Sequence, residues 1–261
     1  MTGLRADRPH TAMAIIPSNL SRQGLLEVLL STEDNSIIVV DENEIQDQLL
    51  QDRIGAAITK MSVAPNGRFI ACYRRDGVLT VLSTTFTTKV LEFDTKSMSR
   101  PLSIDWCGED SVVLLWRNTG IVMVGPYGDW LNFPYDGAVQ VIAEHDCCRI
   151  VTSTTCEILQ RVPPVTEAIR KIGSTDAAAL LFDAMEAYES GDPKSDENLR
   201  DIAASNQLVD AVQSCLSAAA SEYESDKQTS LLKAASYGKA FCIGINPTDF
   251  VNVAKKLRIL N

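Results

Sequence analysis

The chain has 261 residues, of which 45% are hydrophobic and 22% charged, and its formal net charge is −10. This composition is typical of a folded globular protein and argues against a disordered or fibrous one. The acidic balance argues against nucleic acid as a partner, because binding to phosphate backbones requires clustered Lys and Arg. The longest apolar runs, such as SVVLL and IVMVG, are far shorter than the roughly 20 residues that cross a bilayer, so we expect no transmembrane segment.

The N-terminal stretch MTGLRADRPHTAMAIIPSNL contains a weak apolar patch that Pro17 interrupts. No small-residue cleavage site follows it cleanly, so we expect no secretory signal. Seven cysteines form no C-x-x-C pair, which argues against a disulfide framework and against a zinc site. We therefore expect a cytosolic protein without a metal or a cofactor.

The first part of the chain alternates short runs of β-branched and aromatic residues with turn signals. One group of four expected strands consists of ITKMSV (58–63), RFIACYR (68–74), VLTVL (78–82) and KVLEFD. The turns Pro65-Asn66-Gly67 and Asp76-Gly77 separate its members, since Asn, Asp and Gly accept the positive φ that a tight hairpin requires. These features predict a four-stranded antiparallel sheet.

The next group, LSIDW, SVVLLWR, IVMVG and WLNF, repeats the same plan with turns at CGED and NTG. The two groups align without a gap, so that Tyr73 matches Trp116 and Gly77 matches Gly120. A four-stranded unit that recurs every 40–45 residues or so is typical of a β-propeller blade. We expect the aromatic side chains Tyr73, Phe69, Trp106 and Trp116 to pack between blades and Trp130 to be half exposed.

Weaker units flank these two. LLEVLL, SIIVVDENE and IQDQLL lie upstream around the turn TEDN, and VQVIAEHDCCRIVTSTTCEILQRV lies downstream as a shortened last unit. The sequence thus predicts three to four WD40-like blades, an all-β partial propeller over residues 1–163. Because a propeller has four to eight blades, we expect the chain either to begin inside a larger propeller or to close a small or open one.

From Thr166 the apolar spacing becomes helical. In DAAALLFDAMEAYESGD the expected buried face carries Ala177, Leu180, Leu181, Ala184, Met185 and Tyr188. Ser174 or Thr175 is the expected N-cap, and Gly191 with Pro193 ends the helix. Further helices are expected over residues 195–204 (capped by Ser195), 206–222, 226–237 and 247–258. Short connections between them predict antiparallel pairs, an all-α solenoid over residues 164–261.

Pro163 and Pro164 lie between these two kinds of sequence. We expect Leu159 to Val162 to close the last blade and Thr166 to start the first helical turn, with both prolines between strand and helix. The chain is then a mixed multidomain protein.

No phosphate-binding glycine motif and no G-x-S-x-G elbow occurs in the sequence. The densest polar cluster is EHDCC, which contains Glu144, His145, Asp146, Cys147 and Cys148; His10 is the other histidine. Consecutive residues point to different sides, so we interpret the cluster as a turn beside a buried thiol. Asp196 and Glu197 are expected to stabilise a helix N-terminus. The sequence therefore assigns no catalytic, metal-binding or cofactor-binding residue, and it does not indicate which residues bind partners.

Three stretches resemble the propeller-to-solenoid region of the vacuolar protein sorting-associated protein 16 family, from about residue 50 onward. They are CEILQRVPPVTEAIRKIGSTDAAALLFDAMEAYES, DENLRDIAASNQLVDAVQSCLSAAASEYESDKQTSLLKAASYGKAF and FVNVAKKLRILN, of which QTSLLKAASYGKAF (228–241) is the most specific. The resemblance implies a non-enzymatic subunit shared by the HOPS and CORVET complexes. These complexes tether late endosomal and vacuolar or lysosomal membranes for SNARE-driven fusion.

The resemblance also implies partners. They are the other class C vacuolar sorting subunits, a Sec1/Munc18-like subunit and, indirectly, SNAREs and Rab GTPases. In the family, the solenoid continues beyond the end of this chain and carries the Sec1/Munc18-like docking site there, so we expect a truncated form that lacks this site and the early blades. Two alternatives are a free-standing WD-like adaptor that binds a peptide on its propeller face, and an enzyme that uses Cys147 or Cys148.

Overall fold

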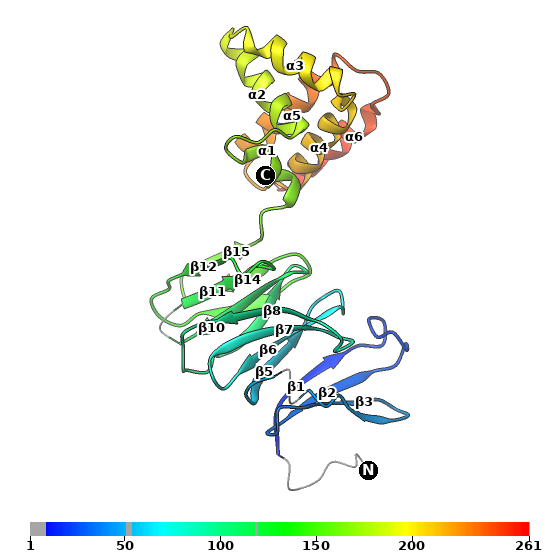
Figure 1. Cartoon of the computed structure of the whole chain (residues 1–261). Helices are drawn as coiled ribbons and strands as arrows, with labels where there is room; N and C mark the ends of the chain where they lie inside the picture. The colour runs from blue at the N-terminus through cyan, green and yellow to red at the C-terminus, as the bar shows by residue number, and fades with distance from the viewer. Residues whose placement is uncertain (1–8, 51–53, 118–119, 261) are drawn as a thin grey trace. The chain divides into compact units, whose positions relative to one another are not determined.

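The computed structural model describes residues 9–50, 54–117 and 120–260. Asn118 and Thr119 of the expected NTG turn, and the start of the N-terminal stretch, lie outside the described residues. The chain divides into two compact units, one up to Arg161 and one from Val162 (Figure 1). We refer to them as the β unit and the helical unit.

The β unit consists of four antiparallel sheets that follow one another in chain order (Figure 1). Blade 1 contains β1 (His10–Ile16), β2 (Glu27–Thr32), β3 (Ile37–Val40) and β4 (Ile45–Asp47). Blade 2 contains β5 (Ile58–Val63), β6 (Phe69–Arg74), β7 (Val78–Ser83) and β8 (Lys89–Asp94). Blade 3 contains β9 (Ser103–Cys107), β10 (Ser111–Trp116), β11 (Gly120–Val124) and β12 (Trp130–Phe133), and blade 4 contains β13 (Gln140–Ala143), β14 (Cys148–Val151) and β15 (Cys156–Leu159). The expected propeller blades, with a shortened last unit, are confirmed.

The sequence prediction missed strand β1. Its residues were treated as a weak apolar patch, yet β1 pairs with β2 and places Ala14 and Ile16 in the core between blades 1 and 2. A single short strand gives little local signal, because its stability comes from the pairing and packing of neighbouring strands.

Three hydrophobic cores hold successive blades together, and in each pair the first strand packs on the first strand of the next blade: β1 on β5, β5 on β9 and β9 on β13. Between blades 2 and 3 the Tyr73 and Trp116 rings meet edge to face, with centroids 6.0 Å apart. Trp106 Nε1 donates to the Ser62 carbonyl at 3.1 Å. These aromatic residues are buried as expected, and their repeat-related positions form the blade interface.

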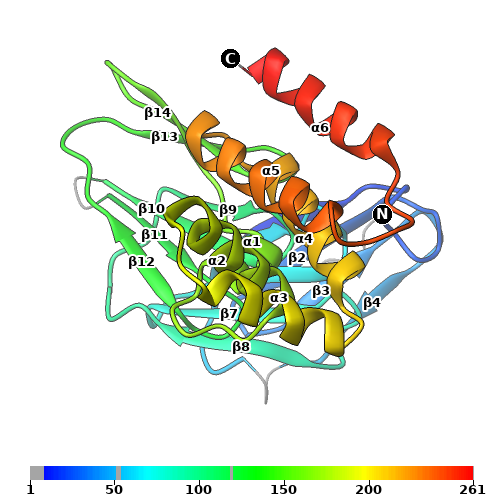
Figure 2. The same ribbon diagram turned by 90° about the horizontal axis from the view of Figure 1, so that it is seen from above.

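The helical unit contains α1 (Pro164–Arg170), α2 (Ala177–Ser190), α3 (Lys194–Ala204), α4 (Leu208–Ser221), α5 (Ser225–Lys239) and α6 (Pro247–Leu260). Helices α2 and α3 pack against each other, as do α4 and α5, around a single core, and α6 packs on α4 and α5 (Figure 2). The expected helical hairpins are confirmed.

Several local details differ from the prediction. Asp176, rather than Ser174 or Thr175, caps α2, since its Oδ1 accepts from the Ala178 N–H at 2.9 Å. Ser195 is buried inside α3 and does not cap it. Tyr188, in the last turn of α2, is 64% exposed rather than buried, and its ring lies 5.2 Å from that of Tyr237 on α5. Capping competes among several adjacent polar residues, and tertiary packing decides the outcome.

The proline pair does not lie wholly between strand and helix. Strand β15 ends at Leu159, and α1 begins at Pro164 rather than at Thr166, with Pro163 as its N-cap. The Glu167 N–H donates to the Pro163 carbonyl at 2.9 Å. Proline fits the first helical position because its missing N–H would have no partner there and its fixed φ already suits a helix.

A buried arginine joins two carboxylates in blade 2. Arg74 is 7% exposed; its Nη1 donates to Glu92 at 2.8 Å and its Nε donates to Asp76 at 3.1 Å. Hydrogen bonds from Lys89 and Arg74 lower the pKa of Glu92. Burial acts to raise the pKa of Asp76, but the hydrogen bond and charge of Arg74 outweigh it and the pKa falls.

These shifts predict a loss of stability in acid. A carboxyl group whose pKa is lower in the folded state stabilises the fold above its unfolded pKa, about 4, and loses this contribution as the pH falls below it. Replacing Arg74 by Met should therefore flatten the decline in urea midpoint between neutral pH and about pH 3. Tryptophan fluorescence measures the midpoint. Arg75→Met is the control, because Arg75 is exposed and reaches Glu33 only at 3.8 Å; equal pH dependence in both variants would contradict the prediction.

Candidate partner-binding surfaces

The EHDCC segment forms the turn between β13 and β14, as expected, and its last residue, Cys148, begins β14. Arg149 Nε donates to Glu144 Oε1 at 2.6 Å and its Nη2 to Oε2 at 3.2 Å, so the carboxylate belongs to an ion pair. Cys147 and Cys148 are buried. Among the residues that the structure describes, no group of three His, Cys, Asp or Glu side chains could hold a metal ion.

The thiols of this segment are poorly suited to nucleophilic chemistry. Burial, together with the hydrogen bond to Glu144, raises the pKa of Cys147 to about 12. The neighbouring Cys107 thiol and burial raise the pKa of Cys148. A catalytic cysteine requires the opposite shift, toward the thiolate. The geometry therefore favours a packing role for both thiols.

One face of blade 1 is an exposed apolar surface. The strand register aligns Met13 with Leu30 and Ile38 in one row, and Ile15 with Val28 and Val40 in the next. Met13 is 59% exposed and Ile15 is 49% exposed, whereas their neighbours Ala14 and Ile16 are buried toward blade 2. Exposed apolar patches of this kind are typical of protein interfaces.

The corresponding face of blade 4 is mixed, with exposed isoleucines on either side of an arginine. There the register aligns Ile142, Arg149 and Ile158, and Arg149 forms the ion pair with Glu144. At the outer strands of blades 2 and 3, Trp130 is 57% exposed, as the sequence predicted, and its ring lies 6.4 Å from that of Phe93. The β unit thus exposes an apolar surface on blade 1 and an aromatic pair at the outer strands of blades 2 and 3.

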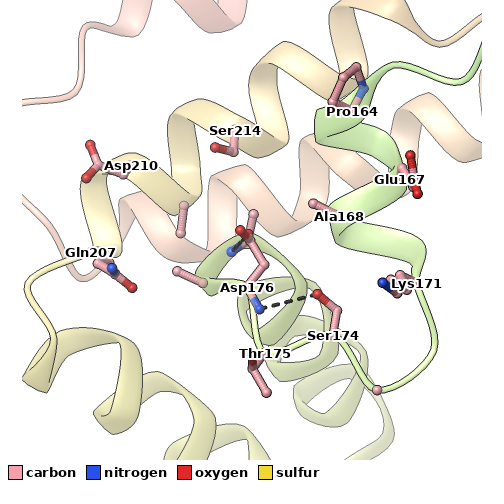
Figure 3. A pocket seen from close by; sticks show the side chains of 14 residues that line it. Pro164, Glu167, Ala168, Lys171, Ser174, Thr175, Asp176, Gln207, Asp210 and Ser214 are labelled. Carbon is pink, nitrogen blue, oxygen red and sulfur yellow. Dashed lines mark hydrogen bonds between the residues drawn. The ribbon is translucent and has the colours of Figure 1, made fainter. Parts of the chain in front are cut away.

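A groove of about 760 Å³ lies in the helical unit between α1, the N-terminus of α2 and α4 (Figure 3). Its polar side chains include Glu167 from α1, Lys171 directly after α1, and Asp210 from α4. The third carboxylate, Asp176, is occupied in capping α2. Sequence analysis missed this groove, because α1 and α4 are about 40 residues apart and only their packing creates it.

The chain matches the family model described as "Vps16, N-terminal region" over residues 5–252. The chain belongs to the Vps16 family. This confirms the resemblance of the α-helical stretches and extends it through all four blades.

Two relatives illustrate the similarity. "Protein VACUOLELESS1" of Arabidopsis thaliana is 38% identical over 252 residues, which cover 91% of this chain and 29% of that protein. The "Vacuolar protein sorting-associated protein 16 homolog" of Dictyostelium discoideum is 36% identical over 252 residues, 95% of this chain and 29% of that protein. This Vps16-family chain therefore spans less than a third of the length of these relatives.

Among solved structures, the "beta-propeller domain" of Cps50 (Swd1) from Myceliophteria thermophila has a TM-score of 0.43 and 11% identity, covering 59% of this chain and 54% of that one. In the part of the Vps16-family chain that the structure describes, no helix combines the length and the apolar character that crossing a bilayer requires.

Proposed function

We propose that this chain is a non-enzymatic scaffold subunit of a HOPS/CORVET-type tethering complex. The observation that best supports this proposal is that the chain belongs to the Vps16 family, whose relatives are named for vacuolar protein sorting. In this function the protein is cytoplasmic and peripheral on late endosomal and vacuolar or lysosomal membranes. Its partners are the other class C vacuolar sorting subunits. The propeller, residues 1–163, and the solenoid, residues 164–261, act as separate domains.

Two features support a scaffold rather than an enzyme. The cysteines of the EHDCC segment are buried with raised pKa values, which disfavours the thiolate. The apolar face of blade 1 provides a surface that association with another protein would remove from water. Repeat architectures present such extended surfaces for assembly.

Affinity purification tests this proposal. The tagged chain, expressed in cells that contain the tethering machinery, should co-purify class C vacuolar sorting subunits, identified by mass spectrometry. A control chain that carries Gly238→Leu, with a disrupted helical unit, should recover fewer of the subunits that bind the solenoid. Recovery of the folded chain without any class C subunit would contradict the proposal.

The alternative, a free-standing propeller adaptor, predicts different behaviour of the purified chain. An adaptor should be a stable monomer at micromolar concentration. A scaffold with an uncovered apolar face on blade 1 should self-associate. Light scattering after size-exclusion chromatography distinguishes the two, because a monodisperse monomer would favour the adaptor.

A further inference from the structure

A second cavity, of about 700 Å³, lies between blades 1 and 2. Its walls come from the β1–β2 connection, the β5–β6 turn and the β7–β8 loop. Neither the family match nor the proposed scaffold function assigns it a role. The cavity combines an apolar floor with charged walls, the arrangement typical of a binding site.

The floor of the cavity includes Leu20, Phe69 and Phe86. Phe86 is 7% exposed and has a φ of +57°, in the left-handed region that bulky side chains rarely adopt. Its N–H donates to the Ser83 carbonyl at 2.8 Å, which holds the backbone in this conformation. Unfavourable backbone conformations of this kind persist only where the surroundings impose them, and they concentrate at binding sites.

The walls of the cavity are fixed to one another. Thr84 Oγ1 donates to the Gly67 carbonyl at 2.9 Å, and the Thr84 N–H donates to the Arg68 carbonyl at 2.9 Å. These bonds join the β7–β8 loop to the β5–β6 turn. A ligand would therefore meet a preformed surface and would bear little of the entropic cost of ordering these loops.

Two arginines and two carboxylates line the cavity, and one oxygen of each carboxylate already accepts hydrogen bonds from neutral groups of the chain. Glu27 accepts a hydrogen bond from Ser21 Oγ at 2.5 Å, and Asp41 accepts from the N–H groups of Asn43 and Glu44. Arg22 and Arg68 have no side-chain partner within the described residues. The formal charges of the cavity balance, but its two guanidinium groups are hydrogen-bond donors to which the described residues offer no side-chain acceptor.

We infer that this interblade cavity binds an extended peptide of a partner protein that presents an anionic side chain beside an apolar one. The guanidinium groups of Arg22 and Arg68 would pair with the anion, a carboxylate or a phosphate, while the apolar side chain covers Phe69 and Phe86. Arg favours both anions because its planar fork of donors matches their oxygen atoms.

An immobilised hexapeptide library that contains phosphoserine tests the inference. The purified chain should select sequences in which Asp, Glu or phosphoserine neighbours a large apolar residue, and the selected residue distinguishes carboxylate from phosphate. The best peptide should bind about tenfold more tightly, by fluorescence anisotropy, than its Gln or Ser counterpart, as expected for a charge-assisted hydrogen bond.

The double variant Arg22→Gln/Arg68→Gln should lose this tenfold preference and remain folded, because both side chains are exposed. Lys96→Gln is the matched control, since Lys96 is an exposed cation of the same unit outside the cavity lining. Selection without acidic enrichment, or unchanged binding by the double variant, would overturn the inference. So would binding to vesicles with phosphatidylserine that depends on the two arginines when no peptide binds.

Discussion

Replacing Gly238 by Leu is expected to destabilise the helical unit strongly while the β unit keeps its stability. Gly238 is buried in α5, within the segment SYGKAF that carries the family resemblance. A Cβ at this position would lie 2.7 Å from Val212 Cγ2 and 2.8 Å from Leu181 Cδ2. Both neighbours are fully buried in the core and have little room to move. Overpacking of this extent should cost about 3 kcal/mol, the upper end of the typical range for inserted side-chain atoms.

The unfolding of the two units can be followed separately by two spectroscopic signals. All three tryptophans, Trp106, Trp116 and Trp130, lie in the β unit, so their fluorescence reports only on the blades. Far-ultraviolet circular dichroism reports mainly on the helices. Gly238→Leu should lower the thermal midpoint of the helical signal and leave the fluorescence transition unchanged. The control Ser236→Leu adds the same side chain at an exposed position of α5 and should behave as the wild type.

If the thermal midpoint of the helical signal is as high in Gly238→Leu as in Ser236→Leu, Leu181 and Val212 can move aside and the prediction is wrong. The double variant Gly238→Ala/Leu181→Ala provides a second test. Because Leu181→Ala vacates the space that the new methyl group needs, the double variant should be more stable than the sum of its single changes.

Replacing Gly120 by Ala is expected to have a comparable effect on the β unit. Gly120 has a φ of +104°, and a Cβ there would lie 2.2 Å from the Phe133 carbonyl oxygen. The repeat-related Gly77 has a φ of +84° and the same relation to the Ser97 carbonyl oxygen, at 2.3 Å. The left-handed conformation costs a non-glycine residue roughly 1–2 kcal/mol. The collision with backbone adds to it, since relief requires the outer edge of the blade to shift.

We expect each of Gly77→Ala and Gly120→Ala to lower the free energy of unfolding by about 3 kcal/mol or more. Urea titration followed by tryptophan fluorescence measures it. Gly128→Ala separates the two contributions, because Gly128 has a φ of +83° but its nearest contact would be Leu91 Cδ1 at 3.7 Å. It should cost only about 1–2 kcal/mol. Equal losses in all three variants would refute the role of the backbone contact.

The propeller could be predicted because its signals are local and repeated. The pairs Gly77 and Gly120, and Tyr73 and Trp116, recur at blade spacing, and the structure places both glycines at positive φ and both aromatic rings between blades. Strand β1 could not be predicted in the same way, because its pairing with β2 and its packing on β5 are tertiary contacts that its own short sequence does not indicate. Helix caps failed for a related reason, since Ser174 and Asp176 are equally good cap residues by type.

No candidate surface could be predicted as a site. The cavity between blades 1 and 2 joins Arg22 to Arg68, two cations that are unremarkable in their own segments. The strained conformation of Phe86 follows an ordinary-looking Thr-Thr-Phe-Thr-Thr sequence, and only the core beneath it explains the left-handed backbone. A buried thiol beside the EHDCC turn was expected, but the ion pair between Glu144 and Arg149 was not.

The amino-acid sequence by itself determined the repeat of four-stranded units, the change from strand to helical periodicity and the family, because each of these depends on residues close together in the chain. The tertiary structure decided which faces of the blades are covered, which arginines lack a partner and where Gly238 allows α2, α4 and α5 to approach. Those properties depend on contacts between segments far apart in sequence, where shape and burial outweigh local preference.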